Sequence, residues 1–297
     1  MKHVFMAAGA AMLALTVGAN AQQTIEWKQV LNLPKGLNQP QGVRLDVLGI
    51  EPGDSYAEVK AKLETLLREA GPSAQPPKPT GGNSSQDVMN RMLGQMSGQS
   101  APRPPITEIK RIIRFSTPGG PIQAEYVGEV HMERTLKGKA GKIVETFTVL
   151  FSAPSSGHQA LSIRRHLSYD NPADQPRVSE VMGLVTQKLK GQPIPQVGGG
   201  RFLYDNGRQL AQQPPGCNIN VQVDNQQMAH GINSNGACDL AYDVHFVNGI
   251  SKDHVLTAEF IVNDAERARQ DIQADFAFFN DYVRGLQNRT GGTAPKL

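Results

Sequence analysis

Hydrophobic residues recur along the chain with two different periods, and the order of these periods predicts an α+β fold. The first strand-like segment is short: Val43, Leu45 and Val47 alternate with Arg44 and Asp46. A period of two is typical of a strand with one buried face, so we expect a strand here.

A helix is predicted directly after this strand. Ser55 and Glu58 have the spacing of a capping box, in which each side chain satisfies a backbone N–H at the helix start. Apolar residues then recur at helical spacing until Gly71-Pro72, at Val59, Leu63, Leu66, Leu67 and Ala70.

Three further strands follow, and the short turns between them predict an antiparallel meander. Their alternating apolar positions are Ile109, Ile113 and Phe115 in the first strand, Ile122, Ala124, Tyr126, Val130 and Met132 in the second, and Ile143, Phe147, Val149 and Phe151 in the third.

The same order of elements begins again after residue 153. A strand from Leu161 to Tyr169 precedes a helix whose apolar face is Val178, Val181, Met182, Val185 and Leu189. Short strands at 202–204 and 255–262 lead to a last helix from Asp264, with Ala265, Ala268, Ile272, Phe276, Phe279, Val283 and Leu286 inward. We therefore predict two tandem modules of a helix packed on antiparallel sheet, at residues 22–153 and 154–287, with a polar tail at 288–297.

Both cysteines of the chain, Cys217 and Cys238, lie on the apolar side of strand-like segments. In an exported protein we expect them to form one disulfide; two free buried thiols are the alternative. With a middle strand at 226–232, the cysteine strands would be about 9.5 Å apart, beyond the roughly 7 Å that a disulfide spans. Either Cys217 lies in the bend after Pro214-Pro215-Gly216, or residues 224–236 form a loop, and we favour the bend.

Residues 1–21 have the pattern of a cleavable signal peptide. Lys2 and His3 precede an apolar run, and Ala19-Asn20-Ala21 predicts cleavage between Ala21 and Gln22. The run is shorter than the roughly 20 residues that cross a bilayer, so we expect no transmembrane segment. Because no cysteine lies near the cleavage point, we also expect no lipid anchor. The sequence predicts a soluble periplasmic protein.

The composition changes between residues 71 and 105, where proline, glycine, serine and glutamine predict a disordered insertion in the first module. Inside it, one helical stripe contains Val88, Met89, Met92, Leu93 and Met96. A methionine-rich helix can dock in the groove of a partner protein, because thioethers adapt to irregular surfaces. A transient helix without a partner is the alternative, and we favour it.

The formal net charge of +3 gives no argument for nucleic-acid binding. Two groups of basic residues could bind an anionic lipid head group or an acidic partner. We favour the alternative that these residues lie on solvated loops and sheet edges without a ligand. These groups are Arg164, Arg165 and His166, and Lys137, Lys139 and Lys142.

Two short polar patterns are weak candidates for a metal site. Glu129, His131 and Glu133 project from one face of their strand, and Asp243 shares a face with His245. Carboxylate and imidazole groups bind hard or borderline metals. Because every half-buried strand has a polar face, we favour a solvated sheet surface at both positions.

No motif for catalysis stands out. The chain contains no phosphate-binding loop and no Gly-x-Ser-x-Gly turn. Its two cysteines are 21 positions apart, which excludes a Cys-x-x-Cys redox pair. We therefore expect no enzymatic activity and no cofactor.

The stretch from Ile50 to Val59, with Leu63 one turn later, resembles the I-x-x-G-x-(S/T)-x-x-(E/Q)-V-x-x-x-L entry of the BamE-like (SmpA/OmlA) family. The resemblance implies helices packed on a three-stranded antiparallel sheet, as in the similar tandem modules of β-lactamase-inhibitor proteins. It also implies a role in envelope assembly. The chain differs in lacking the lipoprotein cysteine and in carrying the 71–105 insertion.

These features predict a non-enzymatic module that binds or assembles with another periplasmic or envelope protein through exposed sheet faces. The methionine-rich insertion is a second candidate surface for this partner. The alternative is a small-ligand or metal-binding protein that uses residues 129–133 or 243–245. A third hypothesis is an unrecognised hydrolase.

Overall fold

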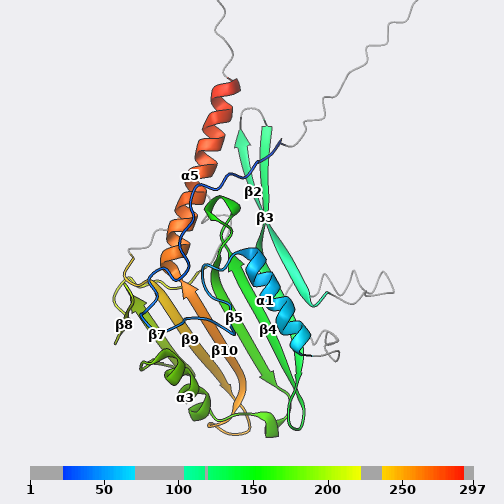
Figure 1. The fold of residues 1–297 in the computed structure, drawn as a ribbon, viewed down its shortest axis with the longest axis vertical. Helices are drawn as coiled ribbons and strands as arrows, with labels where there is room; N and C mark the ends of the chain where they lie inside the picture. The colour runs from blue at the N-terminus through cyan, green and yellow to red at the C-terminus, as the bar shows by residue number, and fades with distance from the viewer. Residues whose placement is uncertain (1–22, 71–103, 118–119, 222–235, 291–297) are drawn as a thin grey trace, which may run out of the picture.

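One large sheet organises the fold. The computed structural model describes residues 23–70, 104–117, 120–221 and 236–290. Over these residues the fold is α+β, with ten strands in the order β1-β3-β4-β5-β10-β9-β7-β6, β2 paired with β3 and β8 paired with β7 (Figure 1). The strands are β1 (Gln23–Thr24), β2 (Ile106–Thr117), β3 (Gly120–Lys137), β4 (Lys142–Phe151), β5 (Ala160–Tyr169), β6 (Ile194–Gln196), β7 (Gly199–Asp205), β8 (Arg208–Leu210), β9 (Leu240–Asn248) and β10 (Val255–Asp264).

Two helices lie over one face of the sheet. These are α1 (Tyr56–Glu69) and α3 (Val178–Leu189), both in front of the sheet in Figure 1. Val59 and Leu63 of α1 and Val185 and Leu189 of α3 are buried in a single core with the strands below them. The apolar faces predicted for both helices therefore pack as expected.

The helix α5 (Ala265–Thr290) packs in a second core, against the β2–β3 hairpin and β5. Both α5 and this hairpin project past the ends of the central strands (Figure 1). Ala268, Ile272 and Phe279 are buried, whereas Phe276 and Val283, predicted to point inward, are only half-buried. The helix also includes residues 288–290, so the predicted tail begins later than expected.

The segment before α1 corrects one prediction. Ser55 caps the helix, and the capping box with Glu58 is complete, as predicted. Residues 43–47, however, form no sheet strand, and Val47 pairs only with Ile50 across a tight turn. Leu45 and Val47 are buried beneath α1 and α3. Their alternation reflects burial in the core that the helices and the sheet share, not strand pairing.

A bulge in β3 corrects a second prediction. The sequence suggests that Tyr126 and Val130 lie on one face, but Tyr126 is buried beside α5 and Val130 beneath α1 and α3. The register of β2 against β3 shifts at Gly128, because Lys110 pairs with Val127 and Ile109 pairs with Glu129. The extra residue reverses which face each later side chain occupies.

The sheet is continuous across residue 153, where the boundary between modules was predicted. β4 pairs antiparallel with β5, and β5 pairs with β10. Two short 3-10 helices, η1 (Pro154–Ser156) and η2 (Pro172–Asp174), flank β5. The tandem origin of the two halves stays a prediction.

The disulfide is confirmed. Cys217 and Cys238 are bonded, with Cα atoms 5.3 Å apart. Cys217 lies in the predicted bend, where its N–H donates to the Pro214 carbonyl at 3.2 Å. The strand-like segment predicted around Cys217 forms no strand over residues 217–221, although Ile219 and Val221 are buried. Ile219 packs beside the disulfide with Leu203 and Ala241, whereas Val221 packs in the core of α5.

Several predictions lie outside the described residues. These are the signal peptide at 1–21, most of the 71–105 insertion with its stripe at 88–96, and the possible middle strand at 226–232.

Candidate functional site

Half of one sheet face has no described helix over it. α1 and α3 cover the opposite face, while α5 and the disulfide-bonded segment cover only one end of this one. We call the remainder the open face. Its side chains come from β3, β4, β5, β10, β9 and β7, and they are Glu129, His131, Glu133, Thr146, Thr148, Arg164, His166, Thr257, Glu259, Ile261, Asp243, His245, Val247 and Arg201.

The strand register arranges these residues in rows. Glu133, Thr146, His166, Glu259 and His245 are successive cross-strand partners in β3, β4, β5, β10 and β9. Cross-strand partners in antiparallel sheet point to the same side and contact one another. A single row therefore contains two imidazoles with one carboxylate between them.

The adjacent row contains His131, Thr148, Arg164, Ile261 and Asp243 in the same strands. The two polar patterns found in the sequence, at 129–133 and 243–245, thus lie on one face of the sheet, with three strands between them. The spacing of hydrophobic and polar residues does not predict this placement, because the placement depends on the order of the strands in the sheet.

Charges on the open face are paired with one another. Arg201 forms a two-point contact with Asp243, at 2.7 Å from Nε and 3.1 Å from Nη2. Glu129 contacts His131 Nε2 at 2.6 Å, and His131 Nδ1 lies 3.2 Å from the Thr148 hydroxyl. The hydrogen bond with His131 lowers the pKa of Glu129 against the opposing effect of burial.

A hollow of about 290 Å³ opens on this face. It is lined by His166, His245, Phe246, Val247, Thr257 and Glu259. The Glu259 carboxylate lies 3.4 Å from Arg164 Nε. Within the described residues, neither the His166 nor the His245 side chain has a hydrogen-bond partner, so both imidazoles are available to a bound group. The hollow combines polar side chains with the exposed Val247, whereas the Phe246 side chain packs in the core on the opposite face and only the edge of this residue borders the hollow.

The geometry does not favour a metal at the predicted candidates. Glu129 and His131 contact each other, while Glu133 belongs to the next row. Across the described part of the chain, no three His, Cys, Asp or Glu side chains are arranged to hold a metal ion.

The predicted basic groups separate in the structure. Arg164 and His166 lie on the open face, but Arg165 points to the opposite face and contacts the buried Glu145 at 2.6 Å. The backbone N–H of Lys139, in the turn between β3 and β4, donates to the Asp174 carboxylate.

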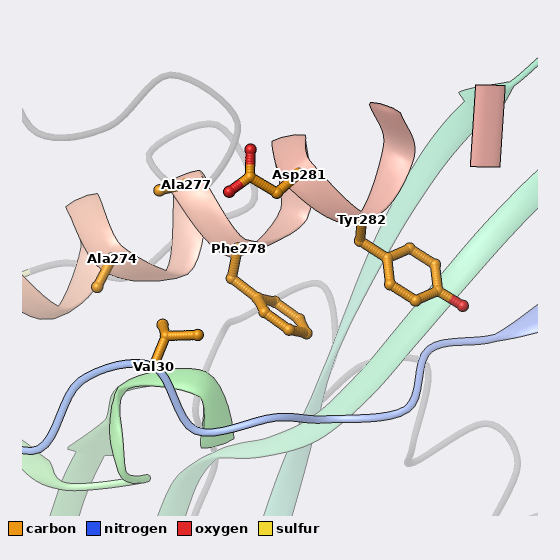
Figure 2. Close-up of a pocket in the computed structure, with 6 residues that line it drawn as sticks. All are labelled: Val30, Ala274, Ala277, Phe278, Asp281 and Tyr282. Atoms are coloured by element: carbon orange, nitrogen blue, oxygen red, sulfur yellow. The ribbon is translucent and has the colours of Figure 1, made fainter. Parts of the chain in front are cut away.

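A second concave surface lies along α5. Figure 2 shows Phe278 and Tyr282 on the side of the helix nearest the N-terminal segment, with Val30 pointing toward them. The cavity is about 380 Å³, and Ala274, Ala277 and Asp281 complete its lining. Its walls are mainly apolar, so it lacks the several converging polar groups that orient most small ligands.

A buried polar cluster beneath α5 was not predicted from the sequence. Arg267 is fully buried and donates to the Asp264 carboxylate at 3.1 Å, to Gln159 Oε1 at 2.6 Å and to the Pro34 carbonyl at 2.6 Å. The cluster connects α5 to the N-terminal segment and to the start of β5. Because these groups are satisfied within the protein, we assign the arginine a structural role.

Two more aspartates extend this cluster along α5. Asp275 accepts from the Ala153 N–H at 3.0 Å and from the Ser155 hydroxyl at 2.5 Å. Asp271 is fully buried near Ser152, and within the described residues it makes no hydrogen bond of normal geometry. Burial raises the pKa of Asp271 to about 8 and that of Asp275 to about 6. The helical spacing of Asp264, Asp271 and Asp275 is the signal in the sequence that could have revealed this buried stripe.

Comparison with protein-family models, with curated proteins and with solved structures gives no match. Among the described helices, none has the length and apolar character needed to cross a membrane.

Proposed function

We propose that this chain is an exported, non-enzymatic envelope protein that binds another protein through the open face. The observation that carries the proposal is the chemistry of that face. It presents rows of polar side chains beside a hollow that the exposed apolar side chain of Val247 borders. Protein interfaces commonly combine an apolar centre with a polar rim in this way.

The charge pairs support a partner of protein size. Arg201 with Asp243, and Glu129 with His131, satisfy one another across or along the strands. Such pairs offer no uncompensated charge or activated nucleophile to a small substrate. They can give specificity to a large partner through complementary charges.

Export to an oxidising compartment is part of the proposal. The Cys217–Cys238 bridge supports it, because disulfides persist outside the reducing cytosol. The signal-peptide pattern of residues 1–21 points to the same destination, the periplasm.

The envelope-assembly role rests on the BamE-like resemblance. In support, α1 contacts β3, where Arg134 donates to the Leu66 carbonyl, and α3 contacts β9, where Lys188 lies over the Tyr242 ring, so two helices pack on different antiparallel strands of the sheet. The complete capping box at Ser55 and Glu58 supports the resemblance at the residue level. We retain the tandem duplication as part of this proposal.

The test compares capture of partners from a periplasmic extract by three proteins: the wild type, Val247→Glu and Leu184→Glu. Val247 is 56 % exposed at the hollow, and Leu184 is 68 % exposed on α3, on the other side of the sheet. Both changes place a charge on an exposed apolar residue, so neither should unfold the chain.

We expect a partner that the wild type and Leu184→Glu retain and that Val247→Glu loses. Equal retention by all three proteins would show that the open face is not the binding surface. Absence of any stoichiometric partner, under conditions that preserve the disulfide, would refute protein binding itself.

The cavity along α5 favours a second candidate function, the binding of a small apolar ligand. Trp27, the single tryptophan of the chain, stacks on Phe278 at a centroid distance of 5.9 Å. Its fluorescence therefore reports occupancy of the neighbouring cavity. Titration with a fatty acid should shift the Trp27 emission in a saturable manner, and an unchanged spectrum would exclude this ligand class.

A further inference from the structure

We propose that β2 pairs antiparallel with β2 of a second copy of this chain, across a twofold axis at Ile109. The proposal concerns the outer edge of β2 and is independent of the open face. Within the described residues, β2 pairs with β3 alone, along all twelve of its residues. An edge of this length presents unpaired N–H and C=O groups to any strand of matching register.

The backbone direction of β2 is fixed by its pairing with β3. The Glu133 N–H donates to the Pro105 carbonyl at 3.1 Å, so odd-numbered residues at this end direct their backbone groups toward β3. In antiparallel sheet these directions alternate with each residue. The extra residue of the bulge lies in β3, so β2 keeps its alternation, and the N–H and C=O groups of Ile106, Glu108, Lys110 and Ile112 point outward.

A twofold axis at Ile109 uses all of these outward groups. Glu108 faces Lys110 of the second copy, Lys110 faces its Glu108, and Ile106 faces its Ile112. Each such pair exchanges two backbone hydrogen bonds, about eight in total. Pro104 and Pro105 end the pairing on one side, since proline has no N–H to donate.

The side chains are self-complementary in this register. Glu108 and Lys110 flank Ile109, so the axis places each carboxylate opposite an ammonium group. Within one chain, Glu108 accepts from Lys60 Nζ at 2.8 Å, and Lys110 contacts Glu125 at 2.6 Å. In the dimer, Lys60 and Glu108 of one copy would continue into Lys110 and Glu125 of the second copy. The twofold axis repeats this series of alternating charges, so two such series cross the interface.

Ile109 supplies the apolar contact. It is 43 % exposed on the opposite face of β2, between the two charged residues. At the axis it meets Ile109 of the second copy in a pair without backbone hydrogen bonds, in which Cα atoms are about 4.5 Å apart. Pairing covers this exposed side chain.

The first experiment uses crosslinking of the full chain with its native disulfide. Ile109→Cys places two thiols together at the axis and should give a covalent dimer on mild oxidation. Thr107→Cys is the matched control, because this exposed residue lies on the same face of β2 but faces Arg111 of the second copy. We expect crosslinking of the Thr107→Cys protein to be at least about tenfold slower, since its thiols are four residues apart along the paired strands.

The second experiment exchanges charges. Glu108→Lys or Lys110→Glu alone places like charges opposite one another and should weaken dimerisation roughly tenfold in sedimentation equilibrium. The double variant restores opposite charges and should recover the affinity. Thermal unfolding of each variant separates a loss of pairing from a loss of folding.

Three results would overturn the proposal. One is a wild-type protein that stays monomeric at about 0.1 mM, a concentration at which even weak pairing is populated. The second is equal crosslinking at residues 107 and 109. The third is a double variant as weak as the single variants, which would show that Glu108 and Lys110 do not meet across the axis.

Discussion

At the scale of single residues, the buried polar cluster beneath α5 is the most consequential feature. Arg267 has several hydrogen-bond acceptors in a site without exposed surface, which offsets much of the cost of burying its charge. Asp271, near Arg267 and Ser152, has no hydrogen-bond partner of normal geometry among the described residues, and burial favours its protonated form. The stability of α5 on the sheet thus depends on pH through this residue.

The Asp271→Asn variant tests this dependence. Burial raises the pKa of Asp271 to about 8 in the folded protein, whereas an unfolded aspartate titrates near 3.9. The folded state therefore binds a proton more tightly, and the contribution of this group to stability is lost as pH rises from about 4 to 8. Asparagine stays neutral, so the variant should exceed the wild type in free energy of unfolding by about 2–4 kcal/mol at pH 8.

Urea denaturation at pH 5 and pH 8 measures this difference for both proteins. The advantage of Asp271→Asn should shrink at pH 5, where the wild-type carboxyl is also protonated. An advantage that does not change with pH would mean that Asp271 is not the titrating group. Arg267, Asp264, Asp275 and Ser152 face Asp271 and are the same in both proteins.

At the scale of elements, the bulge at Gly128 determines which core each half of β3 joins. A Cβ on Gly128 would lie 2.2 Å from Arg111 Cδ, so the side chain of Arg111 occupies the space that a larger residue would need. The bulge directs Tyr126 toward α5 and Val130 toward α1. Any change that removes the bulge would turn the side chains of one half of β3 to the opposite face of the sheet.

Gly128→Ala should therefore destabilise the protein by about 1–3 kcal/mol, because the Arg111 side chain must leave its position over the bulge. Gly183→Ala is the matched control, since a Cβ at this position in α3 meets nothing within 4 Å. It should stabilise the protein by about 0.5–1 kcal/mol through helix propensity. Thermal unfolding of the two variants checks both signs, and a neutral Gly128→Ala would contradict the steric argument.

At the scale of the whole molecule, α1 and α3 pack on one face of a single continuous sheet, and a disulfide fixes the segment beside it. The disulfide links the bend at Cys217 to Cys238, which lies two residues before the start of β9. The two cysteines pack with Leu203, Ile219 and Ala241 in a small core, and this core covers one end of the open face. Global stability and the shape of that face are therefore connected to the oxidation state of the cysteines.

Replacement of Cys217 and Cys238 by alanine should lower the free energy of unfolding by about 3 kcal/mol, as expected for a closed loop of this length. Urea denaturation of the wild type with and without reductant should give a similar loss. Full stability without the bridge would show that packing alone holds this segment.

Export predicts a defined mature chain. Intact-mass measurement of protein from the periplasmic fraction should give a chain that begins at Gln22, with both cysteines oxidised. A mass that includes residues 1–21 would contradict the signal-peptide prediction, and free thiols in the native extract would contradict the oxidising location.

The sequence by itself determined the elements whose signals are local. The period-two segments became β2, β3, β4, β5 and β10, and the spacing of Ser55 and Glu58 fixed the start of α1. The disulfide also followed from the sequence, because two cysteines on apolar positions leave a single pairing. The strands and the helix start depend on residues a few positions apart in the sequence. The disulfide has a single possible partner for each cysteine.

Only the tertiary structure decided which faces meet. Alternation shows that every second residue is buried, but it does not show which helix covers that residue. The bulge at Gly128, which changes the face that the later β3 side chains occupy, could therefore not be predicted from the sequence. Alternation also misread residues 43–47, where Leu45 and Val47 are buried in the shared core of helices and sheet without belonging to a strand. The open face and the raised pKa of Asp271 arise from strand order and packing density. Both result from contacts between residues far apart in the chain, which a local pattern of hydrophobic and polar positions does not specify.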